Sequence, residues 1–219
     1  CPIVDTWWQT ETGAMMISPI AGITPTRPTF ATLPLPGVLP VLMDEEGNEI
    51  VEKKGERAEG RLAMRTPWPS IARTIYGDHQ RYKDTYFSTY KNMYFTGDGA
   101  YRDASGNYRI TGRVDDVVIV SGHNLGTAPI ENAIDEHTDI VECAVVGFPH
   151  DVKGNALYAF VTKYDECKTT DEVLKKEINE LIANTIGAIA KLDKVQFVSG
   201  LPKTRSGKIM RRNLRKIAS

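Results

Sequence analysis

Short apolar segments separated by turn-forming residues dominate the first half of the chain. Prolines at positions 25, 28, 34, 36 and 40 preclude a helix across residues 19–43. The pattern predicts strands at residues 3–8, 61–64, 71–76 and 108–111, a hairpin turn at 44–48 and a helical turn at 79–86. Residues 51–60 are charged and are expected to form an exposed loop. We therefore expect a β-rich portion with the frequent turns of a distorted barrel.

The pattern changes from residue 117 onward, where apolar runs alternate with helical periodicity. Thr127 is expected to cap a helix that carries Pro129 in its first turn. Thr170 is expected to cap a longer helix that ends at Gly187. Strands are predicted at residues 117–120, 140–146, 157–164 and 195–198. The fold class is therefore α+β, with a barrel-like portion over residues 1–114 followed by a small α+β domain over 115–219.

Composition excludes several classes of protein. The 219 residues are 41% hydrophobic and 25% charged, which is typical of a globular protein. The sequence holds no apolar run near 18 residues, so we expect no membrane partner. The three cysteines form no CxxC pair, which favours a reducing compartment such as the cytoplasm or nucleus. The four histidines have no zinc-ligand spacing. The chain opens on Cys1 with no signal-peptide pattern, and we expect it to be a fragment of a longer protein.

Basic residues gather at the end of the chain. Residues 203–219 contain seven Lys or Arg and no acid. Such a tail indicates either nucleic acid or a small anionic ligand, and a solvated tail without function is the plainer alternative. Lys208 follows Gly207 in a loop expected to be flexible, so its ammonium group could reach an anion in a cleft.

Residues 94–127 combine glycine turns, charges and apolar strands. Asp98 is predicted to lie in a tight Thr96-Gly97-Asp98 turn, where its carboxylate could accept hydrogens from a ribose diol. Arg113 could grip a phosphate with its guanidinium fork. Two β-turns and a surface ion pair are the alternative interpretation. Near the start, Trp7 and Trp8 beside Glu11 indicate either a pocket wall or core packing.

Five motifs together resemble the adenylate-forming superfamily, and among its members most closely the acetyl-CoA synthetases. In chain order they are WWQTETG at residues 7–13, TYFSTYKNMYFTGDGAYRD at 85–103, GRVDDV at 112–117, SGHNLGTA at 121–128 and LPKTRSGKIMRR at 201–212. The resemblance implies an enzyme that joins acetate to AMP with ATP and Mg²⁺ and then transfers the acetyl group to CoA. It also implies a missing N-terminal portion with a phosphate loop, so the 219 residues alone are expected to be inactive.

The resemblance assigns roles to individual residues. ATP or AMP would contact the segment before Glu11 and three later positions. These residues are Asp5, Thr6, Trp7, Trp8, Gln9, Thr10, Asp98, Arg113 and the residue at position 124. Trp8 would close the acyl pocket around a two-carbon acid, and Glu11 would help hold Mg²⁺. CoA would contact Ser121, Gly122 and His123, with Gly122 leaving room for the thiol passage. Asp115 would be the hinge, and a backbone cation site would involve Asp135, His137 and Ile140.

Lys208 matches the catalytic lysine of that family. Its ammonium would contact the substrate carboxylate and the α-phosphate, and a protein acetyltransferase and deacetylase would regulate it through its charge. The family usually has an arginine where Asn124 stands, and Ile119, Pro129 and the Ala183–Asn184 region depart from the family pattern as well. These departures concern CoA and phosphate contacts, while the adenylation motifs are intact.

Three alternatives remain open on the sequence. The enzyme could act on propionate or another short-chain acid, because one methylene changes binding by only about 1–3 kcal/mol. The chain could be a nucleic-acid-binding module that uses residues 203–219, although the resemblance implies no nucleic acid. It could also be a scaffold domain, which would have no need of Lys208.

Overall fold

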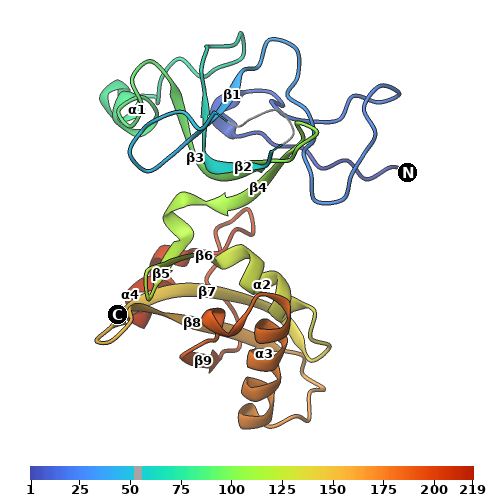
Figure 1. The fold of residues 1–219 in the computed structure, drawn as a ribbon. Helices are drawn as coiled ribbons and strands as arrows, with labels where there is room; N and C mark the ends of the chain where they lie inside the picture. The colour runs from blue at the N-terminus through green and yellow to red at the C-terminus, as the bar shows by residue number, and fades with distance from the viewer. Residues whose placement is uncertain (52–55) are drawn as a thin grey trace. The chain divides into compact units, whose positions relative to one another are not determined.

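The computed structural model describes residues 1–51 and 56–219 and divides the chain into two compact units, Cys1–Val114 and Asp115–Ser219 (Figure 1). The short 3₁₀ helix η2 (Val114–Asp116) spans the division. The predicted α+β fold class is confirmed, since both units combine sheets of mainly antiparallel strands with helices.

The first unit is built on a four-stranded antiparallel sheet in the order β1-β2-β3-β4. Its elements are η1 (Thr10–Thr12), β1 (Pro40–Met43), β2 (Ala58–Met64), α1 (His79–Tyr86), β3 (Tyr94–Arg102) and β4 (Tyr108–Arg113). Apolar side chains from the sheet pack with Trp7, Met16, Ile17 and Trp68 into one core. This core fixes the N-terminal segment against β3, where the candidate site lies.

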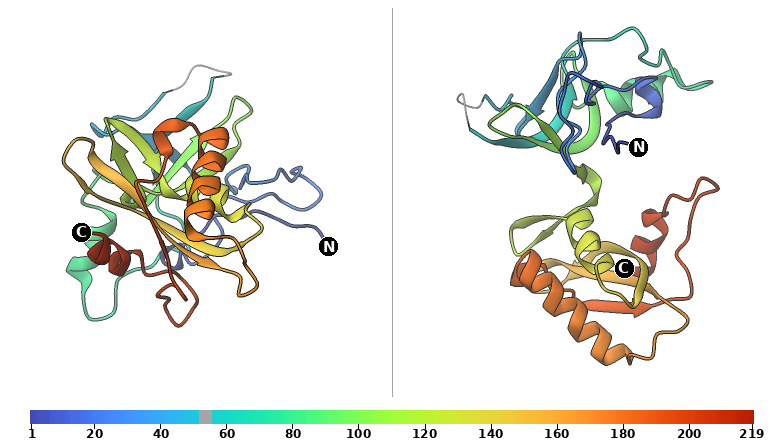
Figure 2. Two further views of the ribbon diagram at one scale, coloured as in Figure 1. Left: turned by 90° about the horizontal axis from the view of Figure 1, so that it is seen from below. Right: turned by 90° about the vertical axis from the view of Figure 1, so that its right-hand side faces the viewer.

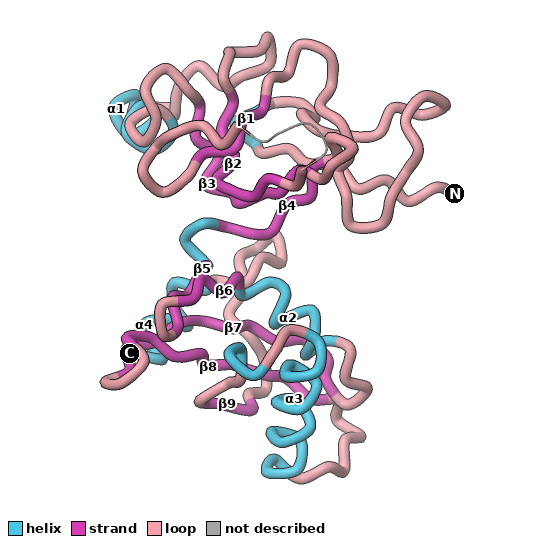
Figure 3. The backbone as a smooth tube through the Cα atoms, in the orientation of Figure 1, coloured by secondary structure: helices cyan, strands magenta, loops and turns pink. Residues whose placement is uncertain are grey.

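Several predictions for the first unit are confirmed. Residues 19–43 contain no helix, and Figure 3 shows loops leading up to strand β1. The turn at residues 44–48 closes with a hydrogen bond from Asp44 N to Asn48 O of 2.9 Å. The strand predicted at residues 61–64 is the second half of β2, the strand predicted at 108–111 is most of β4, and residues 79–86 form α1. In the predicted loop, residues 52–55 lie outside the described part of the chain, and residues 58–60 belong to β2.

Three predictions for this unit are wrong. Residues 3–8 form no strand, because Ile3, Val4 and Trp8 are exposed and only Trp7 makes a β-bridge, with Ile17. Residues 71–76 are also irregular, and only a few of their backbone groups bond to neighbouring segments. Asp98 lies inside strand β3 rather than in a tight turn. The pairing register of that strand shifts between Phe95 and Gly99 against β2, and between Gly99 and Ala100 against β4.

The second unit has a five-stranded sheet in the order β6-β5-β8-β7, with β9 added in parallel to β8. Its strands are β5 (Val117–Val120), β6 (His123–Gly126), β7 (Ile140–His150), β8 (Gly154–Lys163) and β9 (Lys194–Phe197). Its helices are α2 (Thr127–Asp135), α3 (Asp171–Thr185), the 3₁₀ helix η3 (Ala188–Ala190) and α4 (Arg211–Ala218).

The two faces of this second sheet are covered by different helices (Figure 2). Alternate residues of β7, such as Cys143 and Val145, pack with α2 and α3 in one core. The residues between them, Ala144 and Val146, pack with Leu214 of α4 in another. The period of two along a strand therefore places α4 on the face opposite α2 and α3.

The predicted strands and helices of this unit are confirmed, with small shifts at their ends. Thr127 is the first residue of α2 rather than its cap, which is Gly126. Thr170 does cap α3, although its side chain makes no capping hydrogen bond. Helix α4 was not predicted, because its buried face consists of Leu214 and Ala218 alone among basic neighbours.

Candidate active site

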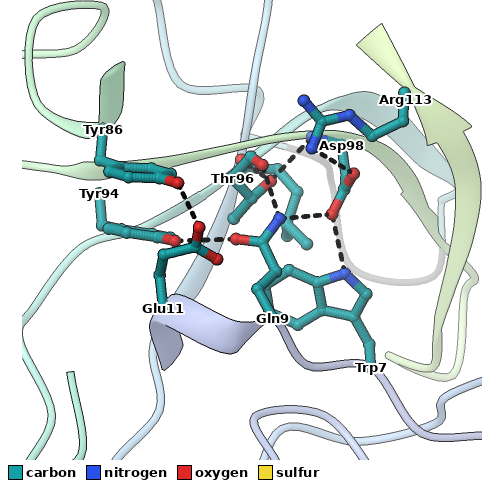
Figure 4. A network of polar contacts seen from close by, with 9 residues as sticks. Trp7, Gln9, Glu11, Tyr86, Tyr94, Thr96, Asp98 and Arg113 are labelled. Carbon is teal, nitrogen blue, oxygen red and sulfur yellow. Dashed lines mark hydrogen bonds and ion pairs between the residues drawn. The ribbon is translucent and has the colours of Figure 1, made fainter. Parts of the chain in front are cut away.

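Asp98 is the buried centre of a polar network in the first unit (Figure 4). Its side chain accepts two hydrogen bonds on Oδ2, from Trp7 Nε1 and Gln9 Nε2, both at 3.0 Å. Its backbone N–H donates to Thr96 Oγ1 at 3.0 Å. Because the residue is only 7% exposed, these donors keep its carboxylate in one orientation.

Gln9 connects this carboxylate with two aromatic residues. Its Nε2 donates to Thr96 O at 2.7 Å as well as to Asp98, and its Oε1 accepts a hydrogen bond of 2.8 Å from Tyr94. Both ends of the amide thus have partners, which defines which end is oxygen and which is nitrogen. Tyr94 stacks on Tyr86, with ring centroids 5.2 Å apart and an angle of 9° between the rings.

Glu11 is the second carboxylate of this network (Figure 4). Tyr86 donates its hydroxyl hydrogen to Oε1 of Glu11. Burial, followed by this hydrogen bond to Glu11, raises the pKa of Tyr86 to about 12. Burial and the charge of Glu11 also raise the pKa of Tyr94. Both phenols therefore stay protonated at neutral pH and act as hydrogen-bond donors.

Arg113 lies opposite Asp98 in the β3–β4 pairing, and its Nη1 is 3.7 Å from Asp98 Oδ1. Its side chain is about half exposed. The guanidinium group lies over Gly97, where an added Cβ would come within 2.9 Å of Nη2. Gly97 also has a φ of +72°, which L side chains rarely adopt. Glycine at this bulge therefore allows both the turn of the strand and the position of Arg113.

Ser121 and Gly122 form the two-residue turn between β5 and β6. Both have positive φ, 49° and 82°, as a type I′ hairpin requires. Ser121 N donates to Lys153 O at 3.1 Å, and His123 Nδ1 lies 3.2 Å from Ser121 O. A Cβ at Gly122 would meet no atom within 4 Å of this unit, so the backbone conformation is the reason for glycine that the structure shows.

Lys208 lies in a hydrogen-bonded turn. Thr204 N donates to Lys208 O at 2.8 Å, and Lys208 N donates to Thr204 Oγ1 at 3.1 Å. The predicted loop therefore folds as a small hairpin, and the Lys208 side chain is exposed on it; its flexibility stays a prediction. Thr204 takes part in both of these hydrogen bonds, although its side chain is exposed.

The basic tail is a structured part of the second unit rather than a solvated extension. Lys203 pairs with Glu142 at 2.6 Å, Arg211 with Glu131 at 2.5 Å and Arg215 with Asp116 at 3.0 Å. These acids neutralise part of the charge that suggested nucleic acid. The exposed cations that remain in this segment include Arg205, Lys208 and Arg212.

Comparison with known proteins identifies part of the chain. Residues 129–208 match the family model of the AMP-binding enzyme C-terminal domain. Residues 129–208 are such a domain. The whole chain is 58% identical to an acetyl-coenzyme A synthetase of Marinobacter nauticus over 219 residues, and 59% identical to one of Gamma-proteobacterium EBAC31A08 over 218 residues. Each alignment covers 100% of this chain and 33% of the relative, so the chain spans about a third of the length of the curated relatives it matches.

Solved structures agree with this assignment. An anthranilate CoA ligase, AuaEII, in complex with anthranoyl-AMP superposes with a TM-score of 0.82 at 27% identity, covering 99% of this chain and 40% of that one. The ATP-bound RpMatB-BxBclM chimera B1 superposes with a TM-score of 0.81 at 27% identity, covering 98% of this chain and 40% of that one. Both superpositions extend over the two units, well beyond the matched domain.

The structure brings together some of the expected site residues and leaves others apart. Trp7, Gln9, Asp98 and Arg113 form one connected group. The remaining residues of the N-terminal segment lie outside it: Asp5 accepts from Thr29 N at 2.9 Å, Thr6 bonds Ser18 at 2.9 Å, and Trp8 and Thr10 are exposed. Of the two tryptophans, Trp7 is core and Trp8 is 57% exposed, so core packing holds for Trp7 and a pocket wall at Trp8 stays a prediction.

Sequence reasoning missed Tyr86, Tyr94 and Thr96 as members of this group. Their only signal was their position within residues 85–103, a motif that we assigned to the family as a whole. Among the described residues, no three His, Cys, Asp or Glu side chains lie close enough to hold a metal ion. Asp135, His137 and Ile140 lie at the end of α2 and the start of β7, where His137 bonds Glu177 and the backbone of Asp139. A cation site of backbone oxygens there stays a prediction.

Asn124 lies in β6 opposite Ile119 of β5, and both side chains are exposed. An amide at this position lacks the charge of the arginine that the family comparison leads us to expect.

No helix in the described parts of the chain is long and apolar enough to cross a membrane.

Proposed function

We propose that the chain is part of an AMP-forming acetate:CoA ligase, in which it supplies the nucleotide-facing carboxylates and the catalytic lysine. The observation that carries this proposal is the hydrogen-bond network that orients the carboxylates of Asp98 and Glu11, beside the half-exposed side chain of Arg113. The identity of 58–59% over the whole chain to proteins named acetyl-coenzyme A synthetase supports the choice of acid.

Asp98 is suited to bind the ribose of ATP. Its Oδ2 is already saturated by Trp7 and Gln9, so the carboxylate cannot rotate when a ligand arrives. A fixed carboxylate accepts hydrogens from a vicinal diol without losing side-chain entropy on binding. Arg113 is within reach of the same ligand, and its fork of donors suits a phosphate or a ribose oxygen. In this proposal the N-terminal segment with Asp5, Thr6, Trp7, Trp8, Gln9 and Thr10 completes the ATP site.

Glu11 fits a magnesium ion that enters with ATP. Mg²⁺ is typically held by one or two carboxylates together with substrate phosphates. Oε1 of Glu11 accepts the hydrogen bond from Tyr86, and this bond orients the carboxylate. Bound there, Mg²⁺ would neutralise phosphate charge, and Tyr86 would keep the Glu11 carboxylate in place.

Lys208 is proposed to act in the first of two steps. Acetate attacks the α-phosphorus, a bond to pyrophosphate breaks, and negative charge gathers between the two reactants. An ammonium group carried by a hydrogen-bonded hairpin can be placed there and stabilise that charge. Acetylation would remove the charge, which is why an acetyltransferase and a deacetylase are proposed partners.

The second step is attack of the CoA thiol on acetyl-AMP, which releases AMP. We propose that the β5–β6 turn borders the CoA path with Ser121, Gly122 and His123. Asp115 is the proposed hinge, and rotation there would bring this turn to the substrates in place of Lys208. Residues 1–114 would then be part of the large adenylating domain and 115–219 the mobile domain. Domain closure used twice allows one small domain to serve both steps.

Acid selectivity is proposed to depend on Trp8, whose indole is largely exposed in the first unit. Such a bulky group can exclude long chains by steric conflict, but it separates acetate from propionate by only about 1–3 kcal/mol per methylene. Propionate is therefore the second candidate substrate. We propose a cytoplasmic or other reducing location, and we propose that the 219 residues alone are inactive.

The test is acetate-dependent exchange between pyrophosphate and ATP by the longer protein that contains this chain, followed by acetyl-CoA formation. The proposal predicts exchange with acetate that does not need CoA. Exchange with propionate or longer acids but not with acetate would move the assignment to another acyl-CoA synthetase. Absence of exchange with any short acid, or acetyl-CoA production by the pure 219-residue chain, would contradict the proposal.

A further inference from the structure

Helix α4 is attached to the second unit by both apolar and charged contacts. Leu214 and Ala218 are buried against Ala144 and Val146 of β7. From the same helix, Arg211 pairs with Glu131 of α2, whose Oε1 also accepts a hydrogen bond from Val145 N at 2.8 Å. Since these partners belong to β7 and to α2, α4 is packed firmly onto this unit.

Arg215 extends from this helix to the first residues of the unit. Its Nη1 donates to the backbone carbonyl of Asp115 at 3.1 Å and to Oδ1 of Asp116 at 3.0 Å. The side chain of Asp116 is mostly buried and that of Arg215 is partly shielded. One guanidinium group therefore holds two consecutive residues at the point where the two units divide, although they lie about a hundred positions away in sequence.

The position of this contact determines which bonds can rotate. The carbonyl of Asp115 belongs to the peptide plane that joins residues 115 and 116, and this plane is rigid. Rotation about the N–Cα and Cα–C bonds of Asp115 moves everything before that plane and leaves the plane itself attached to the second unit. Rotation about the bonds of Asp116 would instead pull the carbonyl away from Arg215.

We propose that Arg215 is a positioning residue that fixes the downstream end of the hinge and confines rotation to Asp115 and the residues before it. This inference rests on the hinge in the proposed function. It explains why a basic residue near the end of the chain is paired with the first residues of the unit. Without rotation about the two bonds of Asp116 the hinge reaches fewer orientations, so each of its two working poses is better defined.

The two steps of the reaction would both depend on this restriction. Lys208 must reach the substrates in one pose and the turn at Gly122 must reach CoA in the other. Loss of Arg215 would widen both distributions, so both half-reactions should slow by similar factors. Loss of Lys208 affects a group needed in one step only, which separates the two residues.

The test compares Arg215→Gln with Arg212→Gln in the longer protein. Arg212 is exposed on the same helix and provides the matched loss of charge. Amide hydrogen exchange at residues 116–118 is expected to be about tenfold faster in Arg215→Gln, as loss of one partly shielded charge-assisted contact implies. Exchange within α4 at Leu214 and Ala218 should match the control, and both half-reactions should fall by at least threefold, about one RT in free energy.

Four results would overturn the inference. Exchange at residues 116–118 could be unchanged, or it could rise equally in Arg212→Gln, which would show that Arg215 holds nothing specific. Faster exchange throughout α4 would assign Arg215 a role in helix stability. Faster hydrogen exchange at residues 116–118 with both half-reactions at the control rate would remove Arg215 from the hinge. Acetate-dependent pyrophosphate exchange by the wild-type protein would still leave the proposed function standing.

Discussion

Tyr86 in α1 donates a hydrogen bond to Oε1 of Glu11, a residue 75 positions earlier in the chain. The same tyrosine stacks on Tyr94, which donates to Gln9, and Gln9 donates to Asp98. A phenol pair and one amide thus connect the two carboxylates to which we assign the metal and the ribose. The connection makes each carboxylate testable through a residue that touches no substrate.

Tyr86→Phe removes the hydrogen bond to Glu11 and keeps the aromatic stack. In the longer protein we expect the magnesium concentration for half-maximal pyrophosphate exchange to rise about tenfold, as loss of a residue that orients a metal ligand typically does. The control is Tyr82→Phe, which removes a neighbouring hydroxyl bonded to the backbone of Ala72 instead. An equal magnesium dependence in both variants would show that Tyr86 does not position Glu11.

The raised pKa of Tyr86 predicts a specific effect of alkaline pH. Its pKa is about 12 in the folded protein and 10.0 as the reference value. A raised folded pKa means that the contribution of the protonated phenol to the free energy of unfolding is complete below pH 10 and is lost as pH rises through 12. The stability difference between wild type and Tyr86→Phe should therefore shrink over this range. Urea unfolding at a series of pH values measures it, and a constant difference would contradict the assignment.

Gly97→Ala and Gly106→Ala separate backbone strain from displacement of Arg113. Both glycines have positive φ, 72° and 86°, so each alanine should cost about 1–2 kcal/mol of stability. Only at Gly97 would the new Cβ approach the Arg113 guanidinium, at 2.9 Å, whereas at Gly106 the nearest atom is Leu33 Cδ2 at 4.0 Å. We expect ATP affinity of the longer protein to fall about tenfold for Gly97→Ala only. Equal affinity of the two variants would remove Arg113 from the nucleotide site.

Trp8→Gly should extend the range of acids that the longer protein activates. Each methylene accommodated in a pocket contributes about 1–3 kcal/mol, so activity on longer acids should rise by at least tenfold per added carbon until the new space is filled. Because Trp8 is 57% exposed, loss of its indole should disturb the first unit less than loss of Trp7, which is buried and bonded to Asp98. An unchanged chain-length profile in pyrophosphate exchange would show that Trp8 does not form the acyl pocket.

Much of the fold follows from local patterns in the sequence. The apolar periodicity of α3 and the runs of β5, β7 and β8 predicted their elements correctly, because each buries a regular face. The proximity of Asp98 and Arg113 follows from the turn at Gly106, which pairs β3 with β4. Helix α4 could not be predicted in this way, since ion pairs to distant acids replace most of an apolar face.

The part of the site that could not be predicted depends on long-range contacts. Gln9 and Glu11 meet Asp98 and Tyr86 only because the N-terminal segment packs on β3, and no local pattern encodes that packing. The bulge at Gly97 was taken for a turn, because a positive φ has the same signature in both. The hairpin that carries Lys208 was not predicted, because the bonds between Thr204 and Lys208 are not visible in composition.

The most direct test of the account measures both half-reactions on Lys208→Ala in the longer protein. Loss of one preorganised donor of positive charge costs on the order of 10²–10³ in rate, so acetate-dependent pyrophosphate exchange should fall by at least that factor. Formation of acetyl-CoA from added acetyl-AMP and CoA should continue at nearly the wild-type rate. Arg205→Ala, which removes an exposed cation from the same hairpin, is the control and should be much milder. Equal impairment of both half-reactions, or impairment of neither, would contradict the role of Lys208 and with it the central claim.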